Sequence, residues 1–370
     1  MSSIISAIGT SNPLNRFSQT RILEFMKNAH QLEGDNARRL EKLYQASGID
    51  FRHSVITDFG KQIGNLDFFG NSPGLEPFPT TAKRGDLFQQ QALTISLAAI
   101  ENAIKHLPDF DLKNITHLIT VSCTGMYAPG LDVEIVEHLE LNPSLERTCI
   151  NFMGCYGAFN ALKMADYICR AQEQATVLIV DVELCTLHFQ KENTVDNWLS
   201  NSLFADGAAA VVVQHKDFAT QKLFEIRAFY TELVSKARHE MSWKIGDHGY
   251  QMQLTNKVTK QIKSEIKNVA EKLLNKLNLT LDDIGQFAIH PGGRRILEVC
   301  DEVFNLKPHQ NKHAYDVLRN FGNMSSATIL FVLDELSQKL KIQKQKVMLP
   351  VVGNCSPKIQ KMKLVLITGA

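Results

Sequence analysis

Stretches of continuous apolar residues alternate with amphipathic stretches along this chain. Apolar runs at 3–10, 117–125, 175–183 and 208–213 predict strands, because unbroken apolar character over four to eight residues is typical of strands covered on both faces. Apolar positions at helical spacing predict helices over 17–30, 35–46 and 86–106, and Ser47–His53 predicts a turn leading into a strand. Residues 60–85 contain five glycines and three prolines and predict an irregular excursion. Buried strands alternating with helices indicate a layered α/β fold.

The second part of the chain repeats the pattern of the first. Residues 113–121 (KNITHLITV) align with 282–290 (DDIGQFAIH), and Asn151-Phe152 align with Asn320-Phe321, both at an offset of 169 residues. Residues 177–180 match 347–350 at an offset of 170. A constant offset between strand–turn–helix signals predicts two duplicated α/β halves, 1–214 and 215–370, with a functional site where the halves meet.

One turn in the first half carries a candidate nucleophile. Cys155 lies in NFMGCYGAFNAL (151–162), between Gly154 and Gly157, and an apolar stretch at helical spacing follows it. A helix N-terminus favours a thiolate, and glycines let a substrate carbonyl approach the backbone. A small buried cysteine in a tight turn is the alternative reading of this stretch.

Length, charge and cysteine content narrow the class of protein. At 370 residues the chain can form two or three units of about 150 residues. A net charge of +1 with interspersed signs gives no indication of nucleic-acid binding. The N-terminus lacks the pattern of a secretory signal, and no apolar run reaches the roughly 18 residues that span a membrane. Seven cysteines without a C-x-x-C pair are typical of a reducing compartment, so we expect a cytoplasmic protein.

Two residues of the second half complete a candidate catalytic set with Cys155. His290 ends an apolar strand before Pro291-Gly-Gly, and Asn323 precedes an apolar helix that runs through Leu336. Each has a simpler interpretation, His290 as a core histidine and Asn323 as a helix N-cap. The repeat, however, brings both opposite Cys155, and cysteine, histidine and an amide can act as nucleophile, base and stabilising donor.

Four segments give this chain a specific resemblance to a known family. They are GCYG (154–157), LFADGAAA (203–210), IHPGGRRIL (289–297) and GNMSSA (322–327). Together with the opening ISAIGTSNP (5–13), they resemble the chalcone synthase-like type III polyketide synthases along almost the whole chain. The resemblance implies a five-layered αβαβα thiolase-like fold with two pseudo-duplicated halves, and a homodimer.

The resemblance also implies an activity. Cys155 would accept an acyl group from a coenzyme A thioester, and His290 would pair with its thiolate and lower the pKa of Cys155 below about 8.5. His290 and Asn323 would bind the carbonyl of malonyl-CoA and stabilise the enolate left by loss of carbon dioxide. No metal and no tightly bound cofactor is expected, since the substrates are free acyl-CoA and malonyl-CoA.

Further positions match the family's substrate pocket. Phe204 and Met252 correspond to two gatekeeper phenylalanines, and methionine gives a more permissive gate. Cys185 and His188 fall at pocket-lining positions, where His188 is either a titratable group that steers cyclisation or a histidine bonded at a strand end. Arg52 corresponds to a basic residue that contacts coenzyme A phosphates, with a solvated surface charge as the alternative.

The match is incomplete near the C-terminus. The family's Gly-Phe-Gly-Pro-Gly loop appears here as GNCSPK (353–358), which keeps only the proline and weakens an assignment to chalcone formation. With Met252, it favours a fatty acyl starter and an alkylpyrone-type product over a resorcinol or phloroglucinol. Two alternatives remain, a ketoacyl-ACP synthase III-like enzyme and a non-catalytic acyl-thioester-binding subunit. His309 and His313 have metal-like spacing but no third ligand nearby, which argues against zinc.

Overall fold

The main sheet consists of two strand groups with the same internal order. A computed structural model describes residues 2–234, 241–254, 258–339, 346–356 and 359–369. The N-terminal group runs β5 (Glu146–Asn151), β4 (His117–Ser122), β6 (Thr176–Leu184), β7 (Asp206–His215) and β1 (Ser3–Ser11). The C-terminal group runs β11 (Gln286–Phe287), β12 (Lys346–Ser356), β13 (Ile359–Gly369) and β8 (Phe224–Val234).

Strand directions repeat between the two groups. β4 is parallel to β6, β6 is antiparallel to β7, and β7 is antiparallel to β1. In the same order β11 is parallel to β12, β12 is antiparallel to β13, and β13 is antiparallel to β8. The groups join where Ser3–Ile5 of β1 pair with Phe224–Ile226 of β8. The fold is therefore duplicated as the sequence repeat predicts, whereas the division at residue 214, one residue before β7 ends, stays a prediction.

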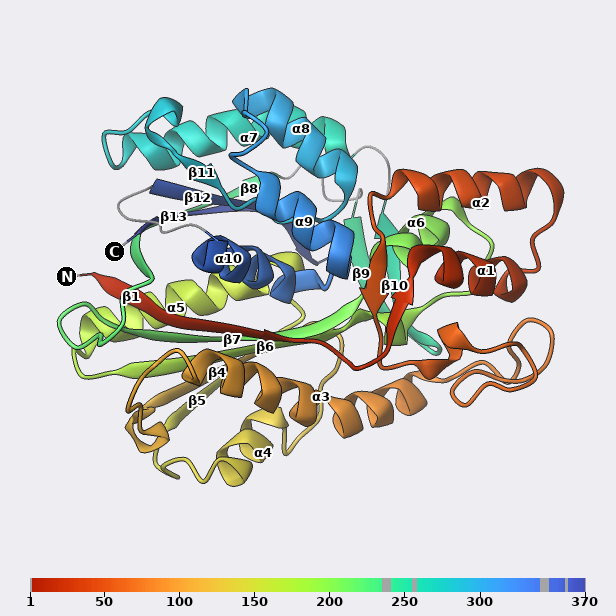
Figure 1. The fold of residues 1–370 in the computed structure, drawn as a ribbon, viewed down its shortest axis with the longest axis horizontal. Helices are drawn as coiled ribbons and strands as arrows, with labels where there is room; N and C mark the ends of the chain where they lie inside the picture. Colours follow the sequence, from red (N-terminus) through yellow and green to blue (C-terminus); the bar gives the residue numbers. More distant parts are fainter. Residues whose placement is uncertain (1, 235–240, 255–257, 340–345, 357–358, 370) are drawn as a thin grey trace.

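Helices and strand groups stack in five layers (Figure 1). α3 (Thr81–Ile104) and α4 (Leu131–His138) cover the outer face of the N-terminal group, and α7 (Val258–Asn275) and α8 (Arg294–Phe304) cover that of the C-terminal group. α5 (Gly157–Ala171) and α10 (Thr328–Lys339) lie between the groups, and α9 (Lys312–Phe321) leads into α10. Because helices cover both of its faces, β6 is buried along its whole length, which explains its continuous apolar sequence.

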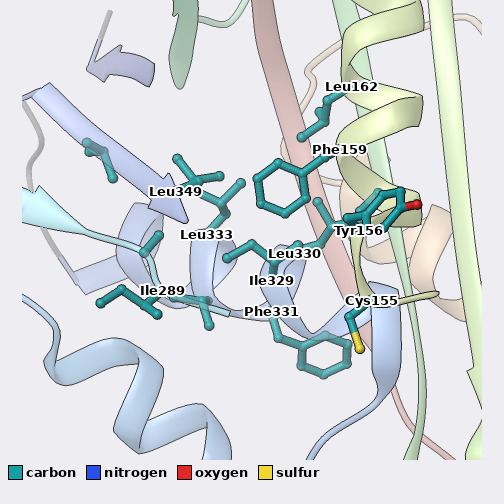
Figure 2. Close-up of a cluster of buried hydrophobic side chains, with 14 of the residues drawn as sticks. Cys155, Tyr156, Phe159, Leu162, Ile289, Ile329, Leu330, Phe331, Leu333 and Leu349 are labelled. Carbon is teal, nitrogen blue, oxygen red and sulfur yellow. The ribbon is translucent and has the colours of Figure 1, made fainter. Parts of the chain in front are cut away.

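The central layer is a core shared by both halves. Figure 2 shows Tyr156, Phe159 and Leu162 near α10, from which Leu330 and Leu333 extend toward them. Cys155 lies at the edge of this cluster, with its sulfur directed away from Phe159. The nucleophile candidate is thus attached to a rigid, fully packed element.

Smaller elements gather at one end of the molecule. They are α1 (Gln19–Ala29), α2 (Gly34–Ala46) and α6 (Val195–Leu203), with the hairpins β2 (Arg16–Ser18)–β3 (Phe51–His53) and β9 (Met241–Gly246)–β10 (Gly249–Leu254) (right in Figure 1). Short 3₁₀ helices connect elements at η1 (Thr57–Gly60), η2 (Leu112–Asn114), η3 (Gly154–Tyr156), η4 (Cys185–His188), η6 (Leu281–Asp283) and η7 (Ser325–Ala327).

Element boundaries differ from the sequence prediction in two places. α3 begins at Thr81 rather than residue 86, because the Thr80 hydroxyl accepts the Lys83 amide and caps the helix ahead of Gly85. The strand expected at 286–290 has only two ladder residues, although Ala288 and His290 donate their amides to Met348 and Pro350. His290 therefore still ends an extended segment.

Candidate active site

Cys155 lies in η3, immediately before α5. It is 7% exposed, and it follows Gly154, whose φ of +70° favours glycine. The Gly154 amide donates to the Cys123 sulfur at 3.0 Å. A Cβ at Gly157 would come within 2.7 Å of Val121, so glycine there lets α5 approach β4 closely.

The surroundings of Cys155 disfavour the expected thiolate. Burial, and then the nearby Glu183 carboxylate, raise the pKa of Cys155 to about 12, while the Ser325 side chain acts in the opposite direction. Burial lowers the pKa of His290 to about 3. α5 begins only at Gly157. The buried carboxyl groups of Glu183 and Asp181 raise the pKa of Cys155, which opposes the effect of the positive N-terminal end of α5. Both shifts oppose the predicted pairing of a Cys155 thiolate with His290, which stays a prediction.

His290 is a buried imidazole with unused hydrogen-bonding capacity. It is 3% exposed, and neither ring nitrogen has a hydrogen-bond partner within the described ranges. A Cβ on Gly292 would lie 3.6 Å from its Nε2 atom, so the ring lies against the Pro-Gly-Gly turn. Because buried polar atoms are nearly always paired, such a ring is suited to a ligand.

Asn323 connects the two other candidates. Its Nδ2 donates to the Gly292 carbonyl at 3.2 Å, next to His290. Its Oδ1 accepts the Ser325 amide at 2.9 Å, but the N-cap residue of η7 is Met324, so the N-cap interpretation of Asn323 is not confirmed. Ser325 in turn lies beside Cys155. The segment from Asn323 to Ser325 therefore contacts both the Pro-Gly-Gly turn after His290 and the Cys155 side chain, and the catalytic set itself stays a prediction.

A pair of buried acids lies behind the cysteine. Glu183 accepts hydrogen bonds from Ser326 at 2.5 Å, the Cys123 amide at 2.9 Å and Thr124 at 2.8 Å. Asp181 accepts a second bond from Ser326 at 2.9 Å, and its Oδ2 has no partner among the described residues. Burial and, for Asp181, repulsion from Glu183 raise the pKa of both acids. The i, i+2 spacing in β6 could have indicated that both point to one face.

One pocket is lined by all five residues expected around the substrate. Its walls include Arg52, Cys185, His188, Phe204 and Met252. Burial raises the pKa of the Cys185 thiol well above its usual value. Other wall residues, which the sequence did not indicate, are Met26, Phe59, Thr186, Phe189, Gln190, Asn197, Ser200, Asn201, Trp243 and Tyr250. Apolar and polar residues alternate over 241–254, which is typical of a hairpin. This alternation was the signal in the sequence that could have indicated Trp243 and Tyr250.

The pocket adjoins the proposed catalytic residues through the backbone. Phe204 and Asn323 form a parallel bridge, in which Asn323 donates to Leu203 and accepts from Ala205, each at 2.9 Å. Phe204, the gate candidate, and Asn323 are therefore held together by backbone hydrogen bonds.

His188 is a fixed wall residue. Its Nδ1 accepts the Tyr250 amide at 3.1 Å, so Nε2 carries the proton and donates to the Thr124 carbonyl at 2.7 Å. The ring stacks on Tyr250 with centroids 3.9 Å apart, and burial lowers the pKa of His188 to about 3. The titratable role was wrong, and the strand-end alternative holds.

Arg52 is not at the surface. It is 3% exposed, and its Nη1 donates to the carbonyls of Asn201 and Phe204, at 2.8 and 2.7 Å. The alternative of a solvated charge was therefore wrong. Its contact with coenzyme A stays a prediction.

Two other expectations concern metals and the C-terminus. Across the described residues, no three His, Cys, Asp or Glu side chains group as metal ligands. Residues 353–356 belong to β12, whereas Pro357 and Lys358 of the altered loop lie outside the described residues. Within the described part of the chain, no helix combines the length and apolar character needed to span a bilayer.

The five layers and the duplicated strand order define a thiolase-like fold. Two sequence profiles match the chain: the N-terminal domain of chalcone and stilbene synthases over residues 2–216, and the C-terminal domain over 225–350. The chain belongs to the chalcone and stilbene synthase family. It is a type III polyketide synthase, an acyltransferase that forms carbon–carbon bonds. The ketoacyl-ACP synthase and non-catalytic alternatives are not supported.

Individual relatives agree with this assignment. The "Alpha-pyrone synthesis polyketide synthase-like Pks18" of Mycobacterium tuberculosis is 28% identical over 348 residues, which are 92% of this chain and 85% of that protein. The structure of PKS-I from the brown alga Ectocarpus siliculosus superposes with a TM-score of 0.91 at 27% identity, covering 100% of this chain and 98% of that one. "Probable polyketide synthase 1" of Dictyostelium discoideum is 27% identical over 338 residues, 90% of this chain, but the chain spans only 10% of that protein.

Proposed function

We propose that this enzyme loads an acyl group from acyl-CoA onto Cys155 and extends it with malonyl-CoA. One observation carries the proposal: an unpaired buried imidazole lies next to a turn whose Gly292 carbonyl accepts from the Asn323 amide, and Asn323 is joined to the buried cysteine through Ser325 and to a pocket through Phe204.

Loading requires a proton acceptor, because burial and the nearby Glu183 carboxylate favour the thiol form of Cys155. His290 takes the thiol proton as Cys155 Sγ attacks the thioester carbonyl carbon. The carbon–sulfur bond to coenzyme A breaks, and the leaving thiolate takes the proton from His290. Acyl-Cys155 and free coenzyme A result.

Extension uses the same donors. Malonyl-CoA binds with its thioester carbonyl at His290 and Asn323. Its carbon–carboxylate bond breaks, carbon dioxide leaves, and the electron pair forms an enolate whose oxygen accepts hydrogen bonds from both residues. The enolate carbon attacks acyl-Cys155, its carbon–sulfur bond breaks, and the chain, longer by two carbons, is carried on coenzyme A.

The pocket supports a long, flexible acyl group and an alkylpyrone-type product. Met252 is a flexible wall residue, and Phe59, Phe189 and Trp243 add apolar surface. The printed name of the mycobacterial relative refers to α-pyrone synthesis. A pyrone would form when an enol oxygen of the chain attacks the thioester carbonyl and releases coenzyme A.

A homodimer and a cytoplasmic location belong to the same proposal. β5 is an edge strand of the described sheet, and Met164 and Tyr167 of α5 are exposed near it, which supports an interface there. Six described cysteines are free thiols, as expected in a reducing compartment.

The test is incubation with malonyl-CoA and acyl-CoA starters of increasing length, with products identified by mass. Cys155→Ala should abolish chain extension, and His290→Ala should abolish carbon dioxide release. Cys300→Ala, in α8 and outside the pocket, is the matched control and should retain activity. Extension that continues unchanged in Cys155→Ala would refute the mechanism.

A further inference from the structure

The C-terminal end of α6 is a junction between the pocket and the proposed catalytic turn. A helix leaves its last carbonyl groups without partners inside the helix. Here Arg52 Nη1 donates to the carbonyls of Asn201 and Phe204. The Tyr44 hydroxyl also donates to the Asn201 carbonyl, at 3.1 Å. The Gln19 side chain donates to Ser202 at 2.8 Å.

The remaining carbonyl of this helix end, that of Leu203, accepts a hydrogen bond from the segment that carries Asn323. Leu203 accepts the amide of Asn323 at 2.9 Å, and Ala205 donates back to the Asn323 carbonyl. Thus each carbonyl from 201 to 204 has a partner, and one partner is the backbone of the proposed catalytic amide. The position of Asn323 therefore depends on where α6 ends.

Arg52 is built into this junction from several sides. Its Nε donates to Gln19 Oε1 at 2.9 Å, which orients the guanidinium. A Cβ on Gly322 would lie 2.9 Å from Arg52 Cγ, so the residue before Asn323 packs directly on the arginine stem. Gly322 has a φ of +74°, which suits glycine. A cation at a helix C-terminus is also favourable, because the helix dipole is negative there.

We propose that Arg52 is a positioning residue that caps α6 and thereby holds Phe204 and Asn323 in place. The guanidinium is almost fully enclosed and two of its three nitrogens are engaged, so it is poorly placed for a hydrated diphosphate. Without it, the Phe204 carbonyl loses its donor, the Asn201 carbonyl keeps only Tyr44, and the end of α6 shifts together with Asn323. The inference rests on the proposed decarboxylative function of Asn323.

Two substrates separate positioning from phosphate recognition. Malonyl-CoA carries the phosphates of coenzyme A, whereas the malonyl thioester of N-acetylcysteamine carries none. In Arg52→Lys the charge is kept, but one ammonium cannot reproduce the fork of the guanidinium. We expect kcat for carbon dioxide release to fall about 10- to 100-fold with both esters, since small displacements of reacting groups cost this much. KM for malonyl-CoA should change by less than about threefold, since ground-state binding is not removed.

A second variant and a control complete the experiment. Gln19→Met removes the acceptor of Arg52 Nε and should lower kcat less than Arg52→Lys does, again equally for both esters. If Arg52→Lys does not fold, this variant tests the proposal instead. Arg227→Lys, exposed on β8, should leave both rates unchanged. A merely structural effect would lower the melting temperature while the folded enzyme kept its kcat.

A defect confined to malonyl-CoA, or no defect, would overturn the role of Arg52. Wild-type enzyme that releases no carbon dioxide from either ester would instead overturn the proposed function.

Discussion

Cys155, Asp181 and Glu183 lie in one buried region, so the charge of each affects the others. Ser326 bridges the two acids, and the unpartnered Oδ2 of Asp181 makes it the simpler one to replace. A native pKa above the unfolded value means that the folded protein binds more protons. Stability therefore falls as pH rises from about 4 through the native pKa values, by up to about 1.4 kcal/mol per pH unit for one proton.

Asp181→Asn should flatten this dependence. The amide cannot ionise, its oxygen can still accept from Ser326, and it gives up no hydrogen bond at Oδ2. Urea unfolding at pH 5, 6, 7 and 8 would measure the slope, with exposed Asp35→Asn as the control. Parallel curves for wild type and Asp181→Asn would contradict the prediction.

Met252 should set the length of the starter. Phenylalanine is bulkier and stiffer, so Met252→Phe should lower kcat/KM for long-chain acyl-CoA at least about tenfold relative to a short starter. Competition between two starters, with products separated by mass, gives this ratio directly. Ile245→Phe, 58% exposed on the neighbouring strand, should leave it unchanged. An equal loss for both starters would mean that residue 252 does not select chain length.

The β9–β10 hairpin illustrates how an element outside the main sheet is held over the pocket. Thr81 of α3 accepts the Gly249 amide at 2.8 Å and donates to the Gly246 carbonyl, so α3 anchors the turn. His188 anchors the following strand through the Tyr250 amide and ring. The hairpin is therefore attached to the N-terminal half by polar contacts at its turn and at the start of β10.

His188→Phe should loosen the hairpin without altering the pH dependence of the reaction. Phenylalanine keeps a ring against Tyr250 but loses both hydrogen bonds. Hydrogen exchange of the Tyr250 amide should accelerate more than that of Gly249, which keeps its bond to Thr81. Because the pKa of His188 is about 3, the kcat profile between pH 5 and 8 should keep its apparent pKa values. Disappearance of an ionisation in that range would show that His188 titrates during turnover.

Across the whole molecule, the shared central layer should make both halves unfold together. Leu333 is fully buried beside residues of α5, so Leu333→Ala should cost about 2–5 kcal/mol. Urea unfolding followed by tryptophan fluorescence and by circular dichroism should give one coincident transition. Leu14→Ala, at a fully exposed position, should change stability by less than about 0.5 kcal/mol. Two separate transitions, with only one displaced, would mean that the halves fold independently.

The sequence could predict what local pattern and repetition encode. Apolar runs predicted β1, β4, β6 and β7, and the constant offset predicted the duplicated fold. It could not predict the surroundings of Arg52, because the carbonyls that bury this arginine lie about 150 residues further along the chain. The charge states of Cys155 and His188 likewise depend on burial by distant elements.

The bridge between Phe204 and Asn323 has a consequence for how product range can evolve. A change that shifts the backbone at 203–205 alters pocket shape and turnover together, so most such changes would be purged by selection. Residues on β10 lie outside that bridge, and substitutions there can alter the accepted chain while the chemistry continues. We expect natural diversity of products in close relatives to be concentrated on this hairpin, with residues 203–205 nearly constant.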